Sequence, residues 1–294
     1  MLDYLQFVLA PQVVTGLALG VAVILVALGL TIIFGLLDVI NMAQGEFYAL
    51  GAFIGVSLAS LGVPFWVLLV LIPLLMLPIG YMTERLLIQR VFHSGERHVT
   101  TLLLTFGLGL VLEDALRLIF GPNPVKPETP IRGALDIAGI VMPNYRLFLV
   151  LFGAFIIAAV ALVIYRTRLG AMVRAAAFDR DMAGSLGVPV TRVYAGAFAF
   201  GVALAGLAGV LLAPIYSVFP TMGRDFIFIA FTVVIVGGMG SIAGTVVAGL
   251  LLTQVQAIAS LYISPVWTDP IVFAIMVVML MLRPQGLFGR LGYA

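Results

Sequence analysis

Long apolar runs dominate this sequence and most constrain what it can fold into. Seven of them approach the ~20 residues that a helix needs to cross a bilayer, near 11–34, 64–83, 100–120, 146–165, 193–213, 242–262 and 268–282. Of the 294 residues 63% are hydrophobic and 10% are charged, whereas about a quarter of a soluble domain is charged. The alternating pattern of a transmembrane β-barrel does not occur. We therefore expect an all-α, polytopic membrane protein.

Two shorter apolar stretches, 41–61 and 226–238, raise the expected number of transmembrane helices to eight or nine, and both are candidates for broken or re-entrant segments. The stretches 31–60 and 232–260 share an apolar run, a glycine-marked break and a small-residue helix. Transporters are often built from two such repeats, although Gly and Ala in membrane helices also produce chance matches. No soluble domain is expected, so 1–294 is treated as a single transmembrane domain.

The positions of the basic residues predict the orientation. Residues 1–84 contain no Lys or Arg, and the first 12 residues lack the basic start and cleavage site of a secretory signal. Three later clusters read as cytoplasmic, namely Arg85, Arg90 and Arg97, then Arg166, Arg168, Arg174, Arg180 and Arg192, and finally Arg283 and Arg290. We expect the N-terminus outside, the C-terminus in the cytoplasm, and the loop 121–145 on the outer face. That loop is either an ordered lid or docking surface, or a plain connection.

Several kinds of chemistry are excluded. With no cysteine there is no disulfide or thiolate metal site, and the single Lys126, between Val125 and Pro127, forms no P-loop. The two histidines, His93 and His98, lie in the first cytoplasmic loop, away from any serine in an apolar run. We therefore expect no enzyme, no metal site and no cofactor in this chain, and no nucleic-acid partner.

Two acidic residues, Glu113 and Asp114, fall in the apolar run 100–120. As neighbours on a helix they point to different sides. We expect them to face the membrane interface, with an ion relay as the alternative.

The segment 35–53 places four polar side chains inside the apolar N-terminal third. If 38–60 is helical, a polar and small-residue face contains Asp38, Asn41, Gln44, Gly45 and Tyr48, together with Gly51, Ala52, Gly55 and Ala59. Such a face either lines a translocation pathway or packs closely on another helix. Glu46 projects onto the bulky side, which makes it a separate functional candidate.

The segment 166–192 is too polar to cross a membrane. We expect a short helix that ends near Gly187, Val188 and Pro189, since Gly and Pro terminate helices. Its predicted apolar side contains Met172, Ala175, Ala176, Met182, Ala183 and Leu186, with Asp179 among them and with Arg174 and Asp181 opposite. This pattern favours docking of a protein partner over a solvated connector.

The spacing of Arg174, Ala175, Asp179, Ala183 and Gly187 resembles the coupling segment of permease subunits in ABC importers for branched-chain amino acids, of the LivH type. The resemblance extends to "GLTIIFGLLDVINMAQGEFYALGAF", "TLLLTFGLGLVLEDALRLIFGP" and "VVIVGGMGSIAGTVVAGLLL", and so covers nearly the whole chain.

This resemblance implies an assembly in the bacterial inner membrane. Two homologous permeases, identical or different, form the pathway, two cytoplasmic ABC ATPase subunits bind ATP and Mg, and a periplasmic solute-binding protein delivers the solute. It also implies that Arg174, Ala175, Asp179, Ala183 and Gly187 couple to the ATPases. The alternatives are a stand-alone secondary carrier or channel and, among substrates, urea, short amides or aromatic acids.

Overall fold

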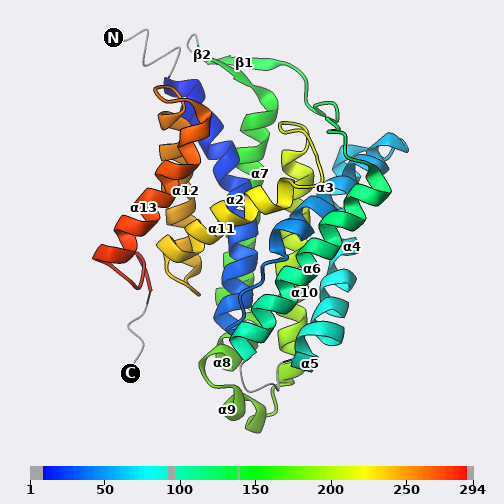
Figure 1. The fold of residues 1–294 in the computed structure, drawn as a ribbon, viewed down its shortest axis with the longest axis vertical. Helices are drawn as coiled ribbons and strands as arrows, with labels where there is room; N and C mark the ends of the chain where they lie inside the picture. Colours follow the sequence, from blue (N-terminus) through cyan, green and yellow to red (C-terminus); the bar gives the residue numbers. More distant parts are fainter. Residues whose placement is uncertain (1–8, 92–96, 138–139, 290–294) are drawn as a thin grey trace.

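The computed structural model describes residues 9–91, 97–137 and 140–289, which form a helical bundle with one β-hairpin (Figure 1). Of the expectations above, those on the first eight residues, His93 and Arg290 lie outside this part of the chain. The helices of the first half are α2 (Ala10–Leu37), α3 (Gln44–Ser60), α4 (Phe65–Thr83), the π-helical turn η2 (Glu84–Ile88), α5 (Gln89–Val91) and α6 (Arg97–Phe120). The second half contains α7 (Asn144–Arg166), α8 (Arg168–Phe178), α9 (Arg180–Ser185), α10 (Val190–Leu212), α11 (Met222–Gly237), α12 (Ile242–Ala259), the 3-10 turn η3 (Pro265–Trp267) and α13 (Thr268–Leu282).

Each predicted apolar run coincides with a helix, so the all-α membrane class is confirmed. Within the described ranges, five segments are long and apolar enough to cross a membrane, namely Ala10–Leu37, Phe65–Val91, Asn144–Arg166, Val190–Leu212 and Ile242–Ala259. The helix Thr268–Leu282 is apolar but shorter. Most of the apolar side chains on α4 and α7 are not buried in the bundle, as expected for helices that face lipid.

The centre of the bundle is formed by α2 and α10, which pack against each other and are buried along nearly their whole length. They run in opposite directions (Figure 1). α2 packs on α12, and α10 packs on α3 and α4. The small residues of α10 permit this close packing, and the Thr31 and Thr245 hydroxyls add a hydrogen bond of 2.6 Å between α2 and α12.

The connection between α2 and α3 is not helical, which corrects the expectation of one helix over 38–60. Asp38 ends α2 in the left-handed conformation, with φ 54°, and donates its backbone N–H to the Phe34 carbonyl. The Asn41 side chain then accepts a hydrogen bond from the Ala43 N–H at 3.1 Å. Such local side-chain bonds stabilise turns at the expense of helix. Therefore Asp38 and Asn41 do not share a helical face with Gln44.

The segment 121–145 contains a β-hairpin of β1 (Ala134–Ile137) and β2 (Ile140–Pro143), in which Leu135 pairs with Met142. Two backbone hydrogen bonds between Val125 and Val218, of 2.9 and 2.7 Å, join this segment to the connection between α10 and α11. The hairpin and this isolated β-bridge are the β-structure among the described residues. The hairpin lies at the opposite end of the bundle from α8 and α9 (Figure 1).

Candidate functional site

The first turns of α3 and α11 are in direct contact. A Cβ atom on Gly45 would lie 2.1 Å from the Gly223 carbonyl oxygen, so neither position has room for a side chain. Three residues further along each helix, the rings of Tyr48 and Phe226 stack with their centroids 4.3 Å apart. Gly45 and Tyr48 are three residues apart on α3, as Gly223 and Phe226 are on α11. The two helices therefore contact each other at corresponding positions of their first turns.

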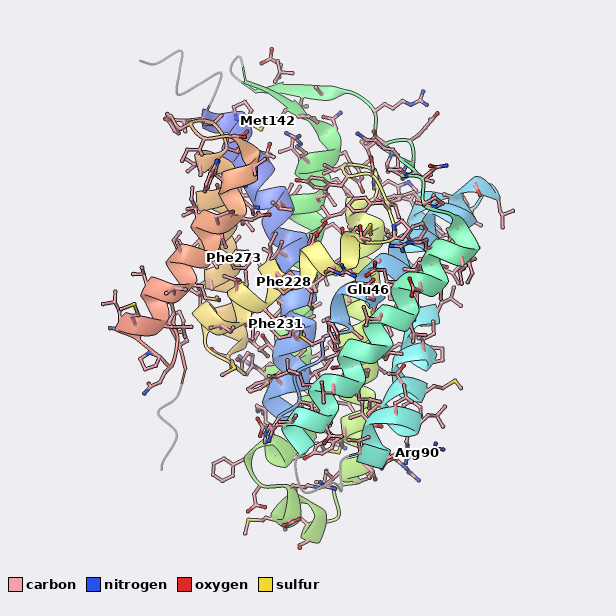
Figure 2. The ribbon with its side chains drawn as sticks, viewed as in Figure 1. Glu46, Arg90, Met142, Phe228, Phe231 and Phe273 are labelled. Carbon is pink, nitrogen blue, oxygen red and sulfur yellow. The ribbon has the colours of Figure 1, made fainter. Side chains whose placement is uncertain are left out.

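Glu46 and Arg224 each directly follow one of these contacting glycines. The Glu46 residue is only 5% exposed, and its Oε2 atom has no hydrogen-bond partner among the described residues. A Cβ atom on Gly223 would lie 2.6 Å from this same oxygen. Figure 2 shows Glu46 near mid-height, between the hairpin end and the α8–α9 end. An unsatisfied carboxyl oxygen thus lies deep in the bundle.

Glu113 of α6 joins this group of charges. Its Oε2 accepts a hydrogen bond from Arg224 at 2.6 Å, and its Oε1 accepts one from Arg117 at 3.2 Å. Asp114 is exposed, so the expectation that these two acids point to different sides is confirmed. The expectation that Glu113 faces the membrane interface is wrong, because Glu113 is buried against α11. We call Glu46, Glu113, Arg117, Arg224 and Asp225 the α3–α6–α11 charge cluster.

Asn41 and Gln44 lie in another environment, fully buried between α3 and α10. The Asn41 Nδ2 donates to the Gln44 Oε1 at 3.0 Å, and the Gln44 Nε2 donates to the Gly201 carbonyl at 2.9 Å. Both amides are therefore used in packing α3 onto α10 in this conformation.

Asp38 lies at the end of α2, where its Oδ2 is 2.6 Å from the His98 Nε2. Both side chains are about half exposed. The six candidate pathway residues thus fall into three environments. Of them, the structure brings only Gly45, Glu46 and Tyr48 to the contact with α11.

The segment 166–192 forms two helices rather than the expected single one. α8 ends at Phe178, and Asp179 begins α9 by accepting a hydrogen bond from the Met182 N–H at 2.9 Å. Because the chain turns here, the apolar side predicted from one continuous helix is wrong. Ala176 and Ala183 are buried within this subunit and are not available to a partner.

The candidate coupling residues have local roles in this segment. Arg174 is exposed and donates to the carbonyl of Ile164, near the end of α7. Gly187, with φ +84°, follows the end of α9, where its N–H bonds to the Gly184 carbonyl and the Val188 N–H bonds to the Ala183 carbonyl. This is a Schellman end, which favours glycine. Ala175 is exposed on α8. These residues therefore stabilise the local structure of the segment 166–192, and its exposed side chains remain accessible to a partner.

Three large apolar side chains are exposed from the end of α8 to the end of α9, and we call them the α8–α9 apolar surface: Phe178 (88%), Met182 (62%) and Leu186 (78%). Leu169 at the start of α8 is also exposed (65%). The sequence-based prediction included Met182 and Leu186 but missed Leu169 and Phe178. Behind α8, a cavity of ≈ 350 Å³ lies between α7, α8 and α10, with Val163, Met172 and Phe200 in its lining. This cavity is partly open and separates part of α8 from α7 and α10.

The sequence-based predictions also missed Arg224, Asp225 and Arg117. A signal for the first two was present, since a charged pair follows Met222 and Gly223 just before an apolar run. The predicted apolar stretch begins at 226, so it does not include Arg224 and Asp225. In the described part of the chain, no group of three or more acidic or histidine side chains is suited to hold a metal ion.

The chain matches known proteins over nearly its full length. Residues 12–280 match the family model described as "Branched-chain amino acid transport system / permease component". The high-affinity branched-chain amino acid transport system permease protein LivH of Salmonella typhimurium is 31% identical over 296 residues, covering 95% of each chain. BraD of Pseudomonas aeruginosa, which carries the corresponding description, is 30% identical with the same coverage.

A second kind of permease also matches. LivM of Escherichia coli (strain K12) is 26% identical over 290 residues, covering 90% of this chain and 67% of that protein. No solved structure matches the chain. The family model and the 31% identical relative both span the whole bundle, including the α3–α6–α11 charge cluster and the α8–α9 segment. The chain is therefore a multi-pass membrane protein of the branched-chain amino acid transport permease family, a transport subunit and not an enzyme.

Proposed function

We propose that this chain is the permease subunit of an ATP-binding cassette importer that carries branched-chain amino acids across the bacterial inner membrane. The observation that carries the proposal is the similarity to LivH along 95% of both chains. LivH is described as part of a high-affinity branched-chain amino acid transport system. Membership of this family supports the expectation that ATP and Mg are bound by partner subunits.

The α8–α9 apolar surface is the proposed contact with two cytoplasmic ABC ATPases. Large apolar side chains exposed in a polar segment that lies outside the membrane are candidates for a protein interface. Basic residues gather in this segment, which supports its placement in the cytoplasm. The hairpin end then faces outward, with the N-terminus outside and the C-terminus in the cytoplasm, and is the proposed docking face of a periplasmic binding protein. The cavity behind α8 leaves space for α8 to move when the ATPases close.

A second permease subunit is expected to complete the pathway, and similarity to both LivH and LivM supports a related but distinct partner chain. Within this chain, α3 and α11 meet at equivalent positions, α2 packs on α12, and α10 packs on α4. These pairings support an inverted repeat that relates α3 to α11. The match of 31–60 with 232–260 stays a separate prediction. With the shorter and broken helices included, we propose nine membrane-embedded helices. The pathway passes the contact of α3 and α11.

Co-expression with candidate partners and reconstitution tests this function. The chain should co-purify with ATPase subunits, and leucine uptake into proteoliposomes should require ATP, the ATPases and the binding protein. A stand-alone carrier would instead transport in liposomes that contain only this chain. Uptake without ATP or partners would refute the importer assignment and support the carrier.

A further inference from the structure

We propose that Glu46 and Arg224 form a binding site for a zwitterionic α-amino acid, with Glu46 taking the ammonium group and Arg224 the carboxylate. This inference rests on the proposed import function and names the side chains that would hold the solute in transit.

The contact between α3 and α11 places an acidic and a basic residue at equivalent positions of the two helices. Gly45 lies against Gly223, and Glu46 and Arg224 each follow one of these two glycines. Arg224 acts electrostatically on Glu46 but forms its ion pair with Glu113, at 2.6 Å. The Glu46 carboxyl group and the Arg224 guanidinium therefore act on each other from two different helices without being paired in this conformation. Once α3 and α11 separate, a zwitterion would meet a group of opposite sign at each of its two charges.

The second observation is the unused oxygen of Glu46. An acid that is 5% exposed and has an unsatisfied Oε2 is energetically unfavourable at membrane depth unless a partner arrives. Besides Arg224, the charged groups that act on it are Glu113 and Asp225, both acidic. The surroundings of Glu46 thus favour a cation, and an ammonium group supplies both the charge and the hydrogen-bond donors.

The first turns of α3 and α11 suit the other end of the solute. Neither Ala43 nor Thr221, the residues before these helices, caps the helix through a side chain. The positive end of each helix dipole stabilises an anionic group, and since these first turns already contain the acidic Glu46 and Asp225, the solute carboxylate would bind beside them at Arg224. Arg224 is about half exposed, at 53% of its side chain, so it can exchange Glu113 for a solute.

The arrangement discriminates between substrate classes. Urea and short amides carry no net charge on either end and would leave both Glu46 and Arg224 without their ionic partners. An aromatic acid without an amino group would satisfy Arg224 but would leave Glu46 unpaired. Only a solute with both an ammonium group and a carboxylate pairs with both Glu46 and Arg224. Buried sites reject analogues that leave such polar groups unpaired.

The test uses the complete assembly in proteoliposomes and measures leucine uptake per ATP hydrolysed. Glu46→Gln should lower this ratio at least about tenfold, as expected for loss of a charge-assisted hydrogen bond. Stimulation of ATP hydrolysis by the loaded binding protein should persist, because Glu46 lies away from the α8–α9 apolar surface. Glu46→Asp keeps the charge and should recover part of the uptake.

Glu84→Gln is the matched control, since Glu84 in η2 is 2% exposed and also has an Oε2 atom without a partner. It should leave the ratio unchanged. Equal effects of the Glu46 and Glu84 substitutions, or wild-type uptake by Glu46→Gln, would overturn the proposal.

If Glu46→Gln fails to assemble, substitutions of the half-exposed Arg224 test the site instead. Arg224→Gln should then lose leucine uptake, whereas Arg224→Lys should retain it. Wild-type uptake by Arg224→Gln would then reject the site. By contrast, absence of ATP-dependent uptake in the wild type would refute the importer function itself.

Discussion

Gly45 of α3 lies against the backbone of Gly223 in α11, so closely that a Cβ atom on Gly45 would come within 2.1 Å of the Gly223 carbonyl oxygen. The contact brings together two helices that begin inside the bundle and lets Tyr48 stack on Phe226. Close approach through glycine is the device by which membrane helices gain packing without a hydrophobic driving force. The position of Glu46 relative to Arg224 depends on it.

Gly45→Ala should therefore destabilise the protein by about 1–3 kcal/mol, because overpacking forces the helices apart. Thermal unfolding of the detergent-solubilised protein measures this as a lower Tm. Gly107→Ala in α6 is the control, since a Cβ atom there would meet nothing within 4 Å. Equal Tm values for the two variants would show that the α3–α11 contact contributes little.

Asn41 and Gln44 are expected to act mainly in packing. The double substitution to leucine removes the hydrogen bond that the Asn41 side chain donates to Gln44 and the hydrogen bond that Gln44 donates to the Gly201 carbonyl. It should lower the Tm and the yield of folded protein, since the buried Gly201 carbonyl loses a donor at a cost of about 1–3 kcal/mol. Uptake per folded molecule should stay close to wild type. A large loss of uptake with an unchanged Tm would instead indicate that these amides contact the solute.

Asp179 has a role in local structure that can be separated from its charge. Asp179→Asn keeps a good N-cap for α9, whereas Asp179→Ala loses the bond to the Met182 N–H and should cost about 0.5–2 kcal/mol of local helix stability. We expect coupling of ATP hydrolysis to uptake to survive in the asparagine variant and to fall in the alanine variant. If both variants lose coupling equally, the carboxylate itself contacts the ATPase.

Phe178 and Leu186 are the most exposed members of the α8–α9 apolar surface, at 88% and 78%. Replacing both with serine should weaken co-purification with the ATPase subunits at least about tenfold, because apolar residues at the centre of an interface carry much of its binding energy. The Tm of the isolated permease should not change. Leu118→Ser on α6, where Leu118 is 86% exposed, is a matched control that should leave co-purification intact.

Much of the fold was predictable because membrane helices are specified by local composition. Each apolar run, such as 146–165 for α7, is long enough to satisfy its backbone hydrogen bonds by itself, so its helical state needs no knowledge of its neighbours. The same reasoning failed at 38–43. There the left-handed Asp38 and the turn around Asn41 depend on short-range bonds that the hydrophobic pattern does not reveal.

The sequence by itself determined the membrane class and the family and singled out Glu46 as a candidate, because these follow from composition, motif spacing and the rarity of charge in an apolar run. Only the tertiary structure decided what surrounds Glu46. Its neighbours Glu113 and Arg224 come from helices far apart in the chain, and nothing local to α3 indicates that they converge. Periodicity can assign a side chain to a face of its own helix, but only the packing of α3, α6 and α11 decides which charges share one interior.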